Sequence, residues 1–167
     1  METWIHSVSS LSDFPAVIKS TSPEETIEIG KRIAFFLSRG SIVALKGALG
    51  TGKTCLTKGI AMGLGIKEEI TSPTYTIIAE YESINPSKFP LENEVIPVYH
   101  IDAYRLRGDD DFCLLGGEEI IYGNGISIIE WSDNVSGIIP PDAIVIEIKF
   151  LDGDNRLIAV NGVRVGK

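Results

Sequence analysis

The feature that most constrains the fold is a glycine-rich run of eight residues, Gly47-Ala-Leu-Gly-Thr-Gly-Lys-Thr54. It matches the pattern G-x-x-x-x-G-K-[ST], in which the backbone N–H groups of a loop surround a phosphate. The apolar segment 41–46 before it is typical of a buried strand, and the segment 54–64 after it predicts a helix that ends at Gly65. A loop that leads into a helix N-terminus forms an anion site. The sequence therefore predicts a P-loop that binds a nucleoside triphosphate.

Two side chains of this loop have expected roles. Lys53 would reach the β- and γ-phosphates, and the hydroxyl of Thr54 would bind Mg²⁺. A glycine-rich turn with a chance lysine is the alternative, and the flanking strand and helix disfavour it.

Length and composition indicate an ordinary globular chain. Its 167 residues, 44% hydrophobic and 23% charged, predict one domain over residues 1–167 with a sizeable core. No apolar run reaches the roughly 20 residues of a membrane span, and the N-terminus lacks the basic and apolar regions of a signal peptide. Cys55 and Cys113 are the only cysteines and lack metal-ligand spacing, so we expect free thiols. The expected location is the cytoplasm, without membrane association.

The charge balance bears on nucleic-acid binding. Fifteen basic and 23 acidic residues give a net charge of −8. Tight binding to a phosphate backbone requires clustered positive charge, so the balance argues against nucleic acid as a direct ligand. It leaves open a role near nucleic acid within a complex, or a local basic patch.

Helix and strand signals follow the chain in an α/β order. Ser22 is a predicted N-cap, Pro23 suits the first helical position and Glu25 would close a capping box. The helix would then bury one apolar face and end at Gly40. The residues expected on that face are Ile27, Gly30, Ile33, Ala34 and Leu37.

Later apolar runs predict strands at 75–81, 95–101, 126–131, 143–149 and 157–160. The polar segment 82–94, with two prolines, would join two strands as an extended hairpin, and one or two short helices would follow residue 109. The predicted fold class is α/β and P-loop NTPase-like, with a mainly parallel sheet, antiparallel additions and flanking helices.

Two predicted strands end in a carboxylate. Asp102 and His100 stand at the end of an apolar strand, and Glu130 ends the apolar run that begins at Ile126. Ligands of open α/β sheets bind beyond the carboxyl ends of the strands, which is where Mg²⁺ ligands belong. Each carboxylate alone could be an ordinary loop-facing charge. Both together behind a P-loop favour a functional site.

Several neighbours of these carboxylates have alternative interpretations. His100 shares a strand face with Asp102 and could bond to it or to a common water, although a structural histidine is commoner. Arg105 could stabilise phosphate charge or form a structural ion pair. The hydroxyl-rich segment 71–76 is either a nucleotide-sensing switch loop or a capped turn before a strand. Trp131 either packs in the core or covers the site.

Four motifs in order resemble the bacterial TsaE family, also called YjeE. They are GALGTGKT at 47–54, TSPTYT at 71–76, HIDAYR at 100–105 and IEW at 129–131. This family contains small P-loop ATPases that support the synthesis of threonylcarbamoyladenosine at position 37 of tRNAs. The resemblance runs from the predicted helix at Pro23 to the strand that ends near Lys149. Two departures are a loop at 82–97 longer than usual in the family, and Ala103 where a larger apolar residue is common.

The resemblance implies ATP and Mg²⁺ as cofactors and assigns roles to particular residues. The implied catalytic residues are Asp102, Lys53 and Thr74, with Thr74 in a nucleotide-sensitive switch. The implied Mg²⁺ ligands are Thr54 and Glu130, and the adenine base would lie near the first helix. The expected nucleotide contacts are Glu25, Thr26, Gly47, Leu49, Gly50, Thr51, Gly52, Lys53, Thr54, Cys55 and Trp131.

The resemblance also implies partners. Members of the family hydrolyse ATP weakly alone and dock on a heterodimer of TsaD and TsaB, whose TsaD subunit carries the transfer chemistry. Hydrolysis would reset that complex between turnovers. The tRNA would be bound only indirectly, through the complex, which agrees with the acidic charge of this chain.

Two other functions compete with this one. A small-molecule kinase would use the same P-loop, but such enzymes have a lid with several arginines. After the P-loop only Arg105 and Arg107 are clustered. A nucleotide-sensing scaffold without turnover is the other, and it would not need Asp102 and Glu130.

Overall fold

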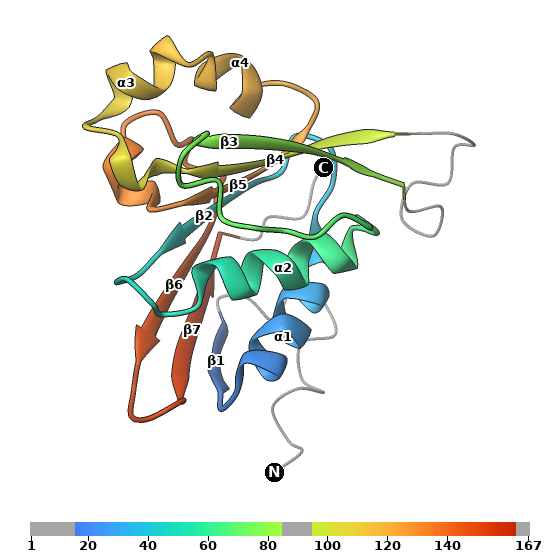
Figure 1. Cartoon of the computed structure of the whole chain (residues 1–167), viewed down its shortest axis with the longest axis vertical. Helices are drawn as coiled ribbons and strands as arrows, with labels where there is room; N and C mark the ends of the chain where they lie inside the picture. The colour runs from blue at the N-terminus through green and yellow to red at the C-terminus, as the bar shows by residue number, and fades with distance from the viewer. Residues whose placement is uncertain (1–15, 85–94, 163–167) are drawn as a thin grey trace.

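A mixed seven-stranded sheet forms the centre of the molecule (Figure 1). The computed structural model describes residues 16–84 and 95–162. The strands are β1 (Ala16–Ser20), β2 (Ile42–Lys46), β3 (Ile78–Ser83), β4 (Ile96–Asp102), β5 (Ile126–Glu130), β6 (Ile144–Phe150) and β7 (Arg156–Asn161). The helices are α1 (Pro23–Phe36), α2 (Lys53–Gly63), α3 (Asp109–Leu114) and α4 (Gly117–Ile121), with 3₁₀ turns η2 (Ala103–Arg105) and η3 (Ser132–Val135). That residues 1–167 form one domain stays a prediction.

The sheet has a parallel core with antiparallel edges, as predicted. Its strand order is β1-β7-β6-β2-β5-β4-β3. The four central strands β6, β2, β5 and β4 are parallel, whereas β7 and β1 at one edge and β3 at the other are added antiparallel. Glu130 pairs in register with Leu45 on one side and Asp102 on the other. Both predicted carboxylates therefore lie side by side at the carboxyl edge, next to the P-loop.

Helices cover both faces of this sheet. On one face, α1 and α2 pack against side chains such as Ile126 and Ile128 of β5. On the opposite face, residues of α3, α4 and η3 pack against Ile129 and its neighbours (Figure 1). Because β5 is buried on both sides, it carries isoleucines on both faces.

The start of α1 differs in one detail from the predicted capping box. The Ser22 hydroxyl accepts a hydrogen bond from the N–H of Glu25 (3.2 Å), as expected. The Glu25 carboxylate, however, accepts from the N–H (2.7 Å) and hydroxyl (2.8 Å) of Thr21, one residue earlier than a capping box requires. The helix also ends at Phe36 rather than Gly40. Its buried face includes Ile29, whereas the predicted Ile27 is only partly buried.

The end of α2 is as predicted. Gly65 has φ +79°, and its N–H donates to the carbonyl of Met62 (3.1 Å). The N–H of Ile66 donates to the carbonyl of Ala61 (3.0 Å), which completes a Schellman motif.

Other boundaries show where local patterns were insufficient. The strand predicted at 75–81 begins only at Ile78, because residues 74–76 form a turn and Ile77 is left-handed at φ +67°. The edge strand β1 was not predicted at all. The hairpin of β3 and β4 is confirmed, although residues 85–94 of its loop lie outside the described residues. Two short helices, α3 and α4, follow residue 109. Within the described ranges, no helix is long and apolar enough to span a membrane.

Helices α1 and α2 approach each other closely through glycines. A Cβ on Gly30 would lie 2.5 Å from the carbonyl oxygen of Leu56, and one on Gly63 would lie 2.6 Å from the Cβ of Ala34. A Cβ on Gly59 would overlap the carbonyl of Ile27. These glycines allow backbone contact between the helix that carries the P-loop and its neighbour.

We expect Gly59→Ala to destabilise the protein by about 1–3 kcal/mol because the added methyl group has no space. The higher helix propensity of alanine, about 1 kcal/mol, acts in the opposite direction and does not compensate. Chemical denaturation measures the free energy of unfolding. Met62→Ala on the exposed side of α2 is the control and should change it little. An unchanged or higher stability of Gly59→Ala would show that the contact is not tight.

Candidate functional site

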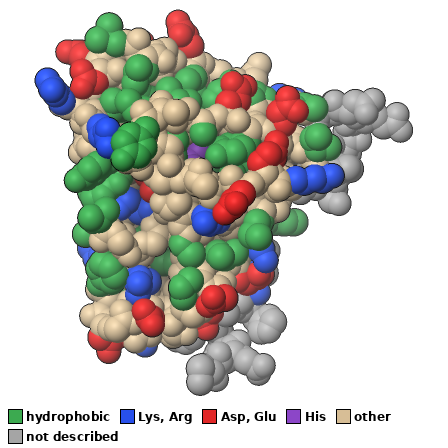
Figure 2. All heavy atoms as spheres, viewed as in Figure 1, with side chains coloured by type: hydrophobic (Ala, Val, Ile, Leu, Met, Phe, Trp, Pro, Cys, Tyr) green, Lys and Arg blue, Asp and Glu red, His purple; other side chains and the backbone are tan. Residues whose placement is uncertain are grey.

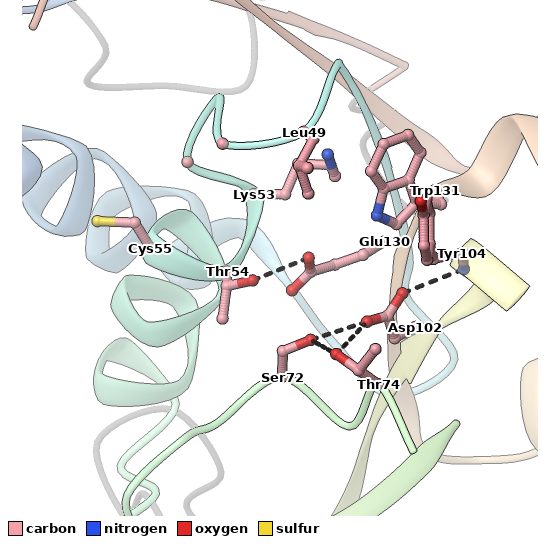
Figure 3. A pocket seen from close by; sticks show the side chains of 12 residues that line it. Leu49, Lys53, Thr54, Cys55, Ser72, Thr74, Asp102, Tyr104, Glu130 and Trp131 are labelled. Atoms are coloured by element: carbon pink, nitrogen blue, oxygen red, sulfur yellow. Dashed lines mark hydrogen bonds between the residues drawn. The ribbon is translucent and has the colours of Figure 1, made fainter. Parts of the chain in front are cut away.

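A pocket of about 320 Å³ opens at the carboxyl ends of β2, β4 and β5 (Figure 3). Its walls come from the P-loop, the start of α2, the segment after α2, and the ends of β4 and β5. It is lined by Leu49, Gly50, Gly52, Lys53, Thr54, Cys55, Ser72, Thr74, Asp102, Tyr104, Glu130 and Trp131. Ten of these twelve residues were predicted from the sequence to form the site, and the structure places them around one cavity.

The P-loop has a backbone that depends on glycine. Gly47 has φ +143° and Gly52 has φ +106°, both in a region that favours glycine. A Cβ on Gly47 would lie 2.5 Å from the carbonyl oxygen of Ile148 in β6. Thr51 braces the turn, with its hydroxyl donating to the carbonyl of Ala48 (2.9 Å).

Lys53 is folded back onto this loop. Its Nζ donates to the carbonyls of Gly47 (2.7 Å) and Ala48 (2.9 Å) and lies 3.8 Å from the centroid of the Trp131 ring. Burial lowers the pKa of Lys53, and the carboxylates of Glu130 and Asp102 partly oppose this. A cationic group that is largely removed from water at the phosphate end of a P-loop fits an anionic ligand.

Thr54 and Glu130 are brought together across the pocket. The Thr54 hydroxyl donates to Oε2 of Glu130 at 3.0 Å, and the Glu130 side chain is buried (Figure 3). A hydroxyl and a carboxylate are hard oxygen donors of the kind that Mg²⁺ prefers in nucleotide sites. The pair fits the Mg²⁺ ligands expected from the sequence.

Asp102 connects the segment 71–76 to the sheet. Its Oδ2 accepts hydrogen bonds from the hydroxyls of Ser72 (2.8 Å) and Thr74 (3.1 Å), and its Oδ1 accepts from the N–H of Tyr104 (3.1 Å). The N–H of Asp102 in turn donates to the carbonyl of Ile77 at 2.8 Å. The carboxylate is therefore fixed beside the metal-type pair, and its position depends on the hydroxyl-rich segment.

Ser72 and Tyr104 line the pocket but were not predicted from the sequence as site residues. Ser72 lies two residues before Thr74 in the TSPTYT motif, so its place in that motif could have indicated it. The ring of Tyr104 lies 4.8 Å from that of Trp131, centroid to centroid, and the two rings form one wall of the pocket. Trp131 thus borders the site and also packs against the core beneath it.

His100 and Arg105, for which the sequence left alternative roles open, both have a defined partner in the structure. His100 hydrogen-bonds through Nε2 to Oε1 of Glu130 at 2.8 Å, and not to Asp102, the partner expected from the sequence. The guanidinium of Arg105 lies 4.6 Å from the centroid of the Tyr75 ring, so its described contact is a cation–π interaction.

Some predicted nucleotide contacts lie outside the pocket wall. The hydroxyl of Thr26 is buried against that of Ser20 (2.8 Å), and the Glu25 carboxylate binds Thr21. The Thr26 methyl group nevertheless lies next to the P-loop, 4.0 Å from where a Cβ on Gly52 would be. An adenine site near these residues stays a prediction.

Leu49 and Cys55 line the pocket in different ways. Leu49 stands at the rim and is exposed. The Cys55 thiol donates to the carbonyl of Pro23 at 3.3 Å and points away from the carboxylates (Figure 3). Burial raises its pKa, so the thiol is a poor nucleophile.

Comparison with known proteins gives one consistent result. The family model "Threonylcarbamoyl adenosine biosynthesis protein TsaE" matches residues 20–158. A relative from Treponema pallidum, named tRNA threonylcarbamoyladenosine biosynthesis protein TsaE, is 40% identical over 141 residues, which cover 84% of this chain and 96% of the relative. A relative of the same name from Bacillus subtilis is 38% identical over 145 residues, which cover 87% of this chain and 84% of the relative.

A solved structure agrees with the sequence matches. The crystal structure of Bacillus subtilis YdiB superposes with a TM-score of 0.71 at 34% identity, and the match covers 89% of this chain and 86% of that chain. The resemblance found in the four motifs thus extends over the fold. The chain belongs to the TsaE family of threonylcarbamoyl adenosine biosynthesis proteins.

Proposed function

We propose that this chain is a Mg²⁺-dependent ATPase that supports threonylcarbamoyladenosine synthesis on tRNA by binding and resetting a TsaD–TsaB complex in the cytoplasm. The observation that carries the proposal is the pairing of Thr54 with Glu130, with Asp102 fixed beside them in the P-loop pocket. A pocket that only bound nucleotide would need the loop but not these two buried carboxylates.

Phosphate binding is assigned to the P-loop. The backbone N–H groups of the loop and the N-terminus of α2 hold the phosphates, and Lys53 contributes its charge. The present contacts of Lys53 with the carbonyls of Gly47 and Ala48 compete with that role. Nucleotide binding therefore exchanges these carbonyls for phosphate oxygens around the ammonium group.

Hydrolysis is assigned to the carboxylates. Thr54 and Glu130 would hold Mg²⁺, which would neutralise charge on the phosphates. Asp102 accepts a hydrogen bond from the attacking water and orients it. Because Thr74 and Ser72 already donate to Asp102, the segment 71–76 is suited to act as a switch whose position sets that orientation.

The partners are inferred from the family and from charge. The relatives are named for threonylcarbamoyladenosine biosynthesis on tRNA, and this chain has a net charge of −8. Lys and Arg side chains are scattered among acidic and hydrophobic ones on the face shown in Figure 2. The net negative charge and the scattered basic side chains favour contact with the tRNA only indirectly, through TsaD and TsaB. Hydrolysis is weak alone and coupled to the complex.

We expect Lys53→Ala to weaken ATP binding, because the loop loses its cation at the phosphates. Glu130→Gln should retain more nucleotide affinity but lose at least about 10- to 100-fold in hydrolysis, as expected when a metal ligand is changed. Isothermal titration and phosphate release measure the two effects. Lys58→Ala is the control, because Lys58 lies further along α2 and does not line the pocket. Normal hydrolysis by Glu130→Gln would remove this residue from the metal site.

Asp102→Asn should keep the fold and much of the nucleotide affinity, since an amide still accepts hydrogen bonds through its oxygen. Turnover should fall by about 10²- to 10⁴-fold, the usual contribution of a positioned proton acceptor. Asp110→Asn, on the exposed side of α3, is the matched control. Full ATPase activity of Asp102→Asn would disprove the assigned role.

The function as a whole predicts dependence of product formation on this chain. With tRNA and the other components supplied, multi-turnover synthesis of threonylcarbamoyladenosine should require the wild-type protein and fail with Asp102→Asn. ATPase activity or nucleotide affinity should change when TsaB and TsaD are added. If omission of the protein leaves multi-turnover synthesis unchanged, the proposal is wrong, and a screen for phosphorylated metabolites would test the kinase alternative.

A further inference from the structure

A buried imidazole that does not line the pocket contacts Glu130. His100 Nε2 lies 2.8 Å from Oε1 of Glu130, and the two side chains are only 1% and 3% exposed. The other carboxylate oxygen, Oε2, accepts the hydrogen bond from Thr54 at 3.0 Å. The two oxygens therefore have different partners, one inside the core and one at the pocket.

The sheet register produces this contact. Asp102 pairs with Glu130, and His100 pairs with Ile128, on the neighbouring parallel strands β4 and β5. Because side chains alternate along a strand, His100 and Glu130 project from the same face, toward α2. The contact thus follows from two strands in the rigid core and not from a loop.

The contact of His100 with an ionised carboxylate requires one particular tautomer of the ring. A carboxylate oxygen without a proton can only accept, so Nε2 must carry the proton in this contact. Nδ1 is buried and has no hydrogen-bond partner within the described residues. An unpaired buried polar atom is destabilising, so the ring occupies this position at a cost in stability. That cost is consistent with a role beyond core packing.

Thr57 does not replace this donor. Its hydroxyl lies 3.4 Å from Oε1 of Glu130 but only 3.0 Å from the carbonyl oxygen of Lys53. A hydroxyl has one proton, and the shorter contact with the helix backbone takes it. His100 is therefore the main donor to Oε1.

We propose that His100 is a positioning residue that fixes the rotation of the Glu130 carboxylate, so that Oε2 faces Thr54, and thereby sets the affinity of the site for a divalent cation. Groups that hydrogen-bond to carboxylate ligands orient those ligands in metal sites. This inference rests on the proposed Mg²⁺ site, and it adds a residue that touches neither nucleotide nor metal.

Two substitutions of His100 separate orientation from packing. His100→Gln places an amide N–H near the position of Nε2, whereas His100→Asn places it near Nδ1, too far from Glu130. The probe is Mn²⁺, titrated by electron paramagnetic resonance in the presence of a non-hydrolysable ATP analogue. We expect His100→Asn to raise the Kd for Mn²⁺ by about 10- to 100-fold, and His100→Gln to stay close to the wild type. Affinity for the analogue in EDTA should be the same for all three proteins.

Ser127→Ala is the matched control, because Ser127 on β5 also has a buried polar atom without a partner in the described part of the chain but faces the other side of the sheet. It should leave the Kd for Mn²⁺ unchanged. Equal Mn²⁺ affinity of His100→Asn and the wild type, or equal losses in the Asn and Gln variants, would overturn the inference alone. Failure of the wild type to bind Mn²⁺ with the analogue would overturn the proposed metal site and this inference with it.

A measurement on the unmodified side chain covers the case in which a variant of His100 does not fold. The sequence contains two histidines, His6 and His100, so His6→Gln assigns the ¹⁵N imidazole signals of His100. We expect a proton on Nε2. A bare Nε2 would leave Glu130 without this donor and would overturn the inference.

Discussion

The buried carboxylate of Glu130 is the group on which the site depends. It lies at the carboxyl end of the inner strand β5, and its two oxygens connect β4, through His100, to the start of α2, through Thr54. A carboxylate that is this buried is destabilising unless each oxygen has a donor. The relative positions of the P-loop helix and the parallel strands are therefore constrained by polar contacts as well as by the apolar core.

Much of this architecture could be predicted from local sequence signals. The P-loop, the glycine at the end of α2 and the apolar strands gave the parallel core, and the carboxyl ends of β4 and β5 gave Asp102 and Glu130. These features depend on short patterns with a strong physical cause, such as a left-handed glycine at Gly65. The remaining family-based roles of Glu25 and Thr26 depend on a bound nucleotide, so they stay predictions.

Three details of the fold could not be predicted from local patterns. The contact of His100 with Glu130 requires the register of β4 on β5, which no local pattern contains. The edge strand β1 is short and, among the described strands, pairs only with β7, from the far end of the chain, so its own sequence contains little signal. The late start of β3 follows from Ile77, which has the left-handed conformation that β-branched residues disfavour.

The conformation of Ile77 has a mechanical consequence. Its N–H donates to the carbonyl of Pro73, and its own carbonyl accepts from the N–H of Asp102, so the segment 71–76 and the carboxylate are connected through the backbone as well as through hydroxyls. Tyr75, within this segment, is 86% exposed and lies against Arg105. An exposed aromatic ring outside the pocket lining is therefore linked, through a few covalent and hydrogen bonds, to the carboxylate inside it.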